Sequence, residues 1–122
     1  MHKVLLVDDD EAILQTLSLL RLEGVDIVGT ALNGAEAVEL AAKLAPDVVV
    51  MDLKMPVMDG IEATRLIKES NPSVQVIMHT AFDEPDLALK AKDVGAYGYL
   101  IKGCSRQATA QMIDEAAGAR PL

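Results

Sequence analysis

The chain is poor in aromatic residues and in cysteine, and each scarcity excludes a class of protein. It has no tryptophan, one phenylalanine and two tyrosines, so it lacks the aromatic platform on which single-stranded nucleic acids stack. Cys104 is the only cysteine, which excludes an internal disulfide framework, and we expect this small side chain to be part-buried. No apolar run approaches the roughly 20 residues that a membrane-spanning helix needs.

Positive charge is also scarce, with 11 Lys and Arg residues against 19 Asp and Glu residues and a net charge of −8. Direct nucleic-acid binding by this domain is not expected, because each phosphate contact requires Lys or Arg. The start of the chain runs directly into a strand-like segment without the features of a signal peptide. We therefore expect a cytoplasmic protein with no membrane partner.

The 122 residues, 51% of them apolar, have the size and composition of one globular domain. We assign residues 1–117 to this domain and residues 118–122 to a tail or the start of a linker. Five short apolar runs are spaced along the domain, and several are continuous rather than alternating, as in strands that are buried on both faces. They are Lys3–Val7, Val25–Thr30, Asp47–Met51, Val74–Met78 and Tyr97–Ile101.

Amphipathic helical patterns lie between these runs. One apolar stripe consists of Ile13, Leu17 and Leu20, and another of Val38, Ala41, Ala42 and Ala45. Asp59, with Glu62 three residues later, resembles the start of a helix with a capping box. Alternating strands and helices predict an α/β fold in which helices cover both faces of one parallel sheet.

Polar residues stand directly after the strand-like runs. Asp8, Asp9 and Asp10 follow the first run, Asp52 the third, Thr80 the fourth and Lys102 the fifth. Because the carboxyl ends of parallel strands lie along one edge of the sheet, these side chains are expected to converge. Clustered carboxylates are suitable ligands for Mg²⁺, and a carboxylate can also act as a nucleophile toward phosphorus.

Four motifs in this order resemble the receiver (CheY-like) domains of two-component response regulators. They are Asp8-Asp9, the segment from Met51 to Gly60, Thr80-Ala81, and the segment from Gly95 to Lys102. The last segment is most similar to the NarL/FixJ-type branch, whose members usually carry a C-terminal helix-turn-helix domain. The resemblance covers nearly the whole chain and implies a flavodoxin-like (βα)₅ three-layer sandwich with strand order 2-1-3-4-5.

The resemblance implies a phosphoacceptor and a magnesium site. Asp52 matches the residue that accepts a phosphoryl group from a histidine kinase, and the domain itself catalyses this transfer without being a conventional enzyme. The Mg²⁺ ligands implied are Asp8 (through water), Asp9, Asp52 and the main-chain carbonyl of Lys54. The family's output is the control of transcription, here through a DNA-binding domain that is not in this sequence.

Three further residues match the machinery that responds to the phosphoryl group. Lys102 matches the lysine that contacts it, Thr80 the switch hydroxyl, and Tyr99 the aromatic residue that turns inward when the hydroxyl moves. Lys54 and Phe82 match positions that tune phosphoryl lifetime. Where receivers commonly have proline after the lysine, this chain has Gly103, which leaves the following loop less constrained.

Simpler interpretations stay open for individual residues. The first aspartates could cap a helix, Lys102 could be only a structural ion-pair partner of Asp52, and Thr80 and Tyr99 could be ordinary strand residues. The whole chain could also be a phosphorylation-independent adaptor or dimerisation module. As a phosphoaccepting receiver, its possible partners include a second copy of the chain in a phosphorylation-enhanced homodimer. A phosphohydrolase of the haloacid dehalogenase type is disfavoured, because that family requires a second Asp where this chain has Lys54.

Overall fold

The computed structural model describes residues 1–81 and 84–119, which form five strands, five α-helices and one short 3-10 helix. The strands are β1 (Lys3–Val7), β2 (Asp26–Ala31), β3 (Val48–Asp52), β4 (Gln75–Thr80) and β5 (Gly98–Ile101). The helices are α1 (Glu11–Ser18), α2 (Gly34–Leu44), α3 (Gly60–Ser70), α4 (Pro85–Asp93) and α5 (Arg106–Gly118), and the 3-10 helix η1 (Leu19–Glu23) follows α1.

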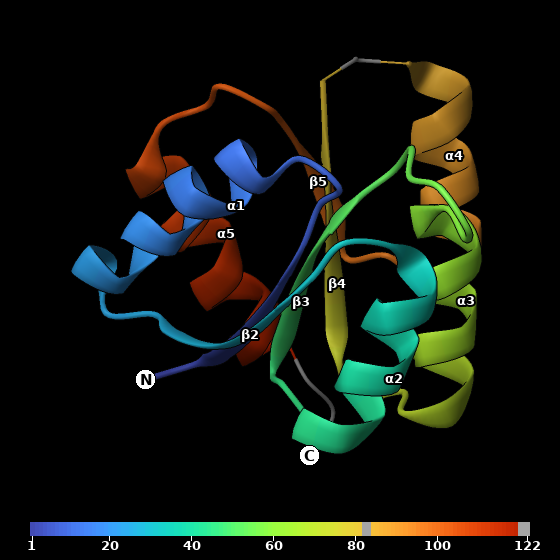
Figure 1. Ribbon diagram of the computed structural model, residues 1–122, viewed down its shortest axis with the longest axis horizontal. Helices are drawn as coiled ribbons and strands as arrows, with labels where there is room; N and C mark the ends of the chain where they lie inside the picture. Colours follow the sequence, from blue (N-terminus) through green and yellow to red (C-terminus); the bar gives the residue numbers. More distant parts are fainter. Residues whose placement is uncertain (82–83, 120–122) are drawn as a thin grey trace.

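All the strand pairs of the sheet are parallel, and the strands lie in the order β2-β1-β3-β4-β5. Helices α1 and α5 cover one face of the sheet, and α2, α3 and α4 cover the other (Figure 1). This arrangement confirms the predicted flavodoxin-like sandwich. Because the strand order reverses between β1 and β3, the carboxyl ends of these strands border the crevice where such sheets bind ligands.

Apolar side chains bury both faces of the central strands, which explains the continuous apolar runs in the sequence. On β3, every residue from Val48 to Asp52 is buried. Val49 and Met51 pack into the cluster under α2, α3 and α4, whereas Val48 and Val50 pack into the cluster under α1 and α5. Asp52 therefore lies at the end of a buried strand, and its carboxylate has little contact with water.

Polar side chains define where four of the helices begin. Each accepts a hydrogen bond from a backbone N–H of the first turn, as N-cap residues do. These residues are Asp10, Asn33, Asp59 and Ser105. The predicted cap at Asp59 is confirmed, since its Oδ1 accepts from Glu62 N at 2.9 Å.

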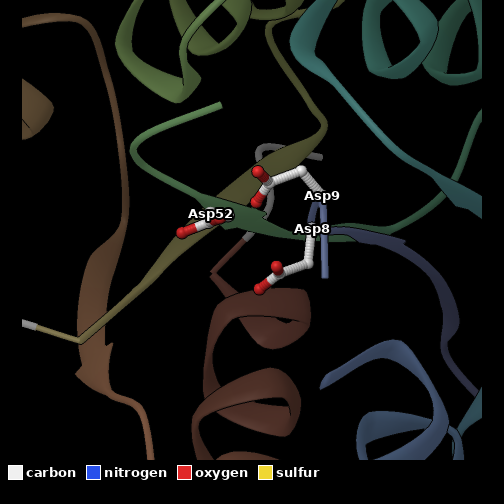
Figure 2. Close-up of side chains that lie close together, drawn as sticks. All are labelled: Asp8, Asp9 and Asp52. Carbon is white, nitrogen blue, oxygen red and sulfur yellow. The ribbon is translucent and has the colours of Figure 1, made fainter. Parts of the chain in front are cut away.

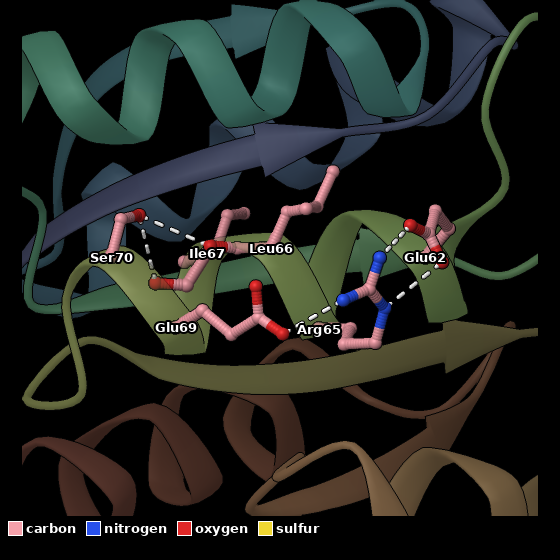
Figure 3. A network of polar contacts seen from close by, with 6 residues as sticks. All are labelled: Glu62, Arg65, Leu66, Ile67, Glu69 and Ser70. Carbon is pink, nitrogen blue, oxygen red and sulfur yellow. Dashed lines mark hydrogen bonds and ion pairs between the residues drawn. The ribbon is translucent and has the colours of Figure 1, made fainter.

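The exposed face of α3 carries a chain of ion pairs. Arg65 lies between Glu62, one turn before it, and Glu69, one turn after it (Figure 3). The same figure shows Ser70 Oγ donating back to the carbonyl groups of the preceding turn. The ion pairs are exposed to solvent and support the helix only weakly.

Some local predictions are wrong. Ala42 and Ala45 are exposed, and Ala37 is buried instead. Ala42 lies inside α2 but outside its buried stripe of Gly34, Ala37 and Ala41, and the left-handed backbone of Ala45 (φ 45°) places that residue beyond the end of the helix. Leu20 is buried as expected but belongs to η1 rather than to the first α-helix. Cys104 is exposed rather than part-buried.

Strand and helix ends also differ slightly from expectation. Asp52 and Thr80 are the last residues of β3 and β4 instead of following them. Helix α5 runs to Gly118, and residues 120–122 of the predicted tail lie outside the described residues, as does Phe82. The division of the chain at residue 117 stays a prediction.

Gly60 allows the loop after β3 to close tightly on the strand end. Its N–H donates to Leu53 O at 2.8 Å. A Cβ atom at this position would lie 2.0 Å from Asp52 O, which is far inside van der Waals contact. The absence of a side chain at residue 60 therefore helps to set the backbone position of Asp52.

We expect Gly60→Ala to lower the free energy of unfolding by about 2–3 kcal/mol, because the new methyl group must push the end of β3 aside. Gly118→Ala is the matched control, since nothing lies within 4 Å of its added Cβ. Urea denaturation followed by circular dichroism measures both variants. Equal stability of the two variants would contradict the close approach.

Candidate functional site

The carboxyl edge of the sheet brings together the polar residues that follow the strands. Asp8 follows β1, Asp52 and Thr80 end β3 and β4, and Lys102 follows β5. They line a shared pocket of about 320 Å³, together with Asp9, Asp10, Lys54 and Ala81. The predicted convergence is confirmed although these residues span most of the chain.

Three carboxylates form the centre of this pocket. Asp8, Asp9 and Asp52 each offer an oxygen within 4.8 Å of the other two, and Figure 2 shows these side chains gathered at the ends of β1 and β3. Asp8 and Asp52 are buried, whereas Asp9 is exposed. The cluster is therefore open to solvent on the side of Asp9.

Asp10 is the N-cap residue of α1. Its Oδ1 accepts from Ala12 N at 2.9 Å at the start of α1. Its own backbone N–H donates to Asp8 Oδ1 at 2.9 Å, which holds the Asp8 carboxylate in place. Capping thus accounts for one of the three consecutive aspartates and leaves Asp8 and Asp9 for another role.

Lys102 supplies the positive charge of the pocket. Its Nζ lies 2.9 Å from Asp8 Oδ2 and 3.2 Å from Asp52 Oδ1. Its backbone N–H donates to Thr80 O at 2.6 Å, which ties it to the end of β4. Gly103 follows Lys102 with φ 96°, a conformation that proline cannot adopt. The presence of glycine where receivers commonly have proline therefore has a local structural reason.

Burial and neighbouring charges shift the pKa values of Asp52 and Lys102. Burial, and next the nearby Asp8 carboxylate, raise the pKa of Asp52 to about 6, against the opposing effect of Lys102. Burial acts to lower the pKa of Lys102, but hydrogen bonds and charge from Asp8 and Asp52 outweigh it and raise that pKa. At neutral pH the pocket therefore contains carboxylates facing an ammonium group.

The donor set fits a hard divalent cation. Three carboxylates and one ammonium leave two negative charges, which is the charge that one Mg²⁺ neutralises, and carboxylate oxygens are the ligands that Mg²⁺ prefers. The side chain of Lys54 is exposed and turns toward Glu84, with 3.7 Å between Nζ and Oε1. Lys54 nevertheless lines the acidic pocket.

Thr80 and Tyr99 lie on adjacent strands near the pocket. Thr80 is buried and lines the acidic pocket, whereas Tyr99 is about one-third exposed on β5. Both also line a void of about 10 Å³ between β4, β5 and α4. This void is too small for a phenol ring, so an inward turn of Tyr99 requires movement of the residues around it.

The sequence reasoning missed two residues of this region. Glu84, at the N-cap position of α4, pairs with Lys54, which lines the pocket, and no motif in the sequence marks it. Gly60 approaches Asp52 O too closely to carry a side chain. Its place directly after the N-cap Asp59 was visible in the sequence, but the close approach was not.

The model of the response regulator receiver domain family matches residues 4–114. The chain belongs to this family. Among curated relatives, the transcriptional regulatory protein LnrK of Bacillus subtilis is 47% identical over 107 residues, which are 86% of this chain and 49% of that protein. This receiver domain spans about half the length of the curated relatives it matches.

Solved structures give the same result. The response regulator domain of Thermotoga maritima CheB matches with a TM-score of 0.91 and 31% identity over 99% of both chains. The signal receiver domain of NarL from Mycobacterium tuberculosis matches with a TM-score of 0.93 and 31% identity over 98% of both chains. These findings confirm the CheY-like fold and the likeness to the NarL-type branch.

In the described part of this receiver, no helix has the length and apolar character needed to cross a bilayer.

We expect Asp52→Asn to stabilise the metal-free protein at pH 7.5 by about 1–2 kcal/mol. With its pKa raised from 3.8 to about 6, Asp52 binds a proton more tightly in the folded state, so its cost to stability is absent at low pH and grows as pH rises through about 6. The gain should therefore shrink toward pH 4. Urea denaturation in the presence of a chelator, at both pH values, measures it, and a gain independent of pH would contradict the assigned cause.

Proposed function

We propose that this receiver domain accepts a phosphoryl group on Asp52 from the phosphohistidine of a histidine kinase and relays the signal to an output. The observation that supports this most directly is the cluster of Asp8, Asp9 and Asp52 facing the single ammonium of Lys102. A purely structural ion pair needs one carboxylate for one lysine. The three carboxylates leave two negative charges in excess of that lysine, which supports a metal-assisted phosphoryl transfer.

In the proposed reaction, a carboxylate oxygen of Asp52 attacks the phosphorus of the donor in line with the leaving group. The new P–O bond forms as the P–N bond to the donor imidazole breaks, and the imidazole leaves and takes up a proton. Asp52 must be ionised to attack, and with a pKa of about 6 most of the molecules are ionised at pH 7 or above. Bound Mg²⁺ would lower the barrier by neutralising the phosphoryl oxygens.

The remaining residues hold the metal and the product. Asp8 (through water), Asp9, Asp52 and the main-chain carbonyl of Lys54 are the proposed Mg²⁺ ligands. Lys102, whose Nζ already lies 3.2 Å from Asp52 Oδ1, is placed to pair with a phosphoryl oxygen. Thr80, at the end of the adjacent strand, is placed to donate its hydroxyl to another.

The proposed output is a population shift of the surface formed by α4, β5 and α5. A phosphoryl group adds about 1.5–2 negative charges, which attract Thr80 and Lys102, and Tyr99 then repacks beside Thr80. The relatives are about twice as long as this chain and include transcriptional regulatory proteins. We propose that a DNA-binding output domain acts with this receiver in the cytoplasm, and that phosphorylation strengthens a homodimer.

The acceptor can be tested by intact mass after incubation with Mg²⁺ and acetyl phosphate. Wild type should gain one phosphoryl group, and Asp52→Asn should gain none. Asp10→Asn is the matched control, because it removes the same charge from a residue of the same pocket and Asn also caps helices well. If neither wild type nor Asp10→Asn gains a phosphoryl group, the domain is a phosphorylation-independent adaptor instead.

The metal site can be tested separately by thermal unfolding. We expect 10 mM Mg²⁺ to raise the melting temperature of wild type, because binding to the folded state alone stabilises it. In Asp9→Asn that rise should be mostly lost, since one of three clustered carboxylates is gone, whereas Asp10→Asn should keep it. An equal rise in both variants would contradict the proposed ligands.

A further inference from the structure

The side chains of Lys54 and Glu84 form an ion pair that the proposed mechanism does not use. Lys54 Nζ and Glu84 Oε1 lie 3.7 Å apart, and both side chains are partly exposed. Lys54 stands in the loop after β3, two residues beyond Asp52, whereas Glu84 occupies the N-cap position of α4. The ion pair therefore connects the loop that leaves the acceptor strand to the start of α4.

The Glu84 side chain does not act as a helix cap. Within the described part of the chain it accepts no capping hydrogen bond from the backbone of α4. Glutamate is also not among the residues that helices prefer at this position. The other four α-helices are capped by side chains, namely those of Asp10, Asn33, Asp59 and Ser105. The carboxylate of Glu84 thus contacts Lys54 instead of the α4 backbone.

Helix α4 is attached to the core by few side chains. Ala91 is the one buried residue of this fully described helix, whereas α3 has four. Glu84 lines the void of about 10 Å³ beneath α4, and Thr80 and Tyr99 line the same void. A change in the contacts of Glu84 would therefore act on a weakly attached helix beside the two proposed switch residues.

The charge of the pocket changes when Asp52 carries a phosphoryl group. Bound Mg²⁺ offsets the two negative charges that Lys102 leaves in the free pocket. Phosphorylation replaces the single charge of the Asp52 carboxylate by about two, so one negative charge is again in excess. Lys54 lines this pocket and carries a second ammonium group. A charge in the partly buried pocket is screened less than the exposed carboxylate of Glu84, so it attracts that ammonium more strongly.

We propose that Glu84 is a positioning residue for phosphorylation of Asp52, because its carboxylate competes with the phosphoryl group for the ammonium of Lys54. This inference rests on the proposed function. Before phosphorylation, the ion pair holds the Lys54 side chain at the start of α4. The phosphoryl group then attracts the ammonium into the pocket, and Glu84 is released. The ion pair thus opposes phosphorylation and couples the acceptor site to α4.

Beryllofluoride with Mg²⁺ measures this competition at equilibrium, because it binds an aspartate carboxylate as a phosphoryl group does. Calorimetric titration at low salt gives its dissociation constant. We expect Glu84→Gln to bind beryllofluoride about two- to fivefold more tightly than wild type, since the exposed ion pair that opposes binding is gone. Asp86→Asn is the matched control, because it removes the same charge from the first turn of α4 and should bind like wild type.

Two conditions separate the competition from a merely structural effect of Glu84. Lys54→Met removes the ammonium and keeps the main-chain carbonyl, and in this background Glu84→Gln should give no gain in affinity. The gain should also disappear in about 1 M salt, where the Debye length falls to about 3 Å. An altered fold of α4 would change the affinity under both conditions.

Amide shifts test the coupling to α4. In ¹⁵N-labelled wild type, beryllofluoride should shift the amides of Asp86 and Leu87 in the first turn of α4. Glu84→Gln should show part of this shift before beryllofluoride is added, because the ion pair is already broken. Identical amide positions in wild type and Glu84→Gln at these two residues would overturn the coupling.

The outcomes distinguish this inference from the function on which it rests. Equal affinity of Glu84→Gln and wild type would overturn the role of Glu84 and leave the acceptor function intact. A gain that persists with Lys54→Met, or that Asp86→Asn shares, would have the same meaning. If wild type does not bind beryllofluoride in the presence of Mg²⁺, the proposed function itself is contradicted, and the role of Glu84 with it.

Discussion

The ion pairs between the ammonium of Lys102 and the buried carboxylates of Asp8 and Asp52 are the interaction on which the rest of the site depends. Burying an unpaired carboxylate is very unfavourable, so neither Asp could lie at the end of a buried strand without this lysine. One lysine cannot balance three carboxylates, however. Burial and the remaining repulsion raise the pKa of Asp52, and they leave the pocket with a charge that suits a divalent cation.

The parallel sheet makes this concentration of charge possible. Each strand ends at the same edge, so residues far apart in the sequence meet without any long loop. Local backbone features complete the arrangement. Gly60 lets the loop after β3 pack against Asp52, Gly103 adopts the left-handed conformation needed just after Lys102, and Asp10 caps α1 while orienting Asp8. The chemistry of the pocket and the stability of the fold are therefore coupled.

Lys102 also connects two layers of the molecule. On one side it faces the acidic pocket, and on the other it borders a cavity lined by His79, between α1 and α5. Thr80 and Tyr99 lie toward α4, around a void too small for the aromatic ring.

The sequence alone determined the fold class, the strand order through the family resemblance, and the residues that gather at the sheet edge. Continuous apolar runs reflect strands that are buried on both faces, and the polar residues after them mark the common edge at which parallel strands end. Both patterns can be read from short segments of the sequence. The buried stripe of α2 was misjudged at Ala42, because which face of an alanine-rich helix packs on the sheet depends on how the helix is docked, and at Ala45, because where a helix ends depends on how the chain turns to meet the next strand. Only the tertiary structure decided which aspartate caps α1, that Lys54 pairs with Glu84, and that His79 Nδ1 lies unpaired beside a cavity. These features depend on distances between elements that are separate in the sequence, and no local pattern encodes such distances.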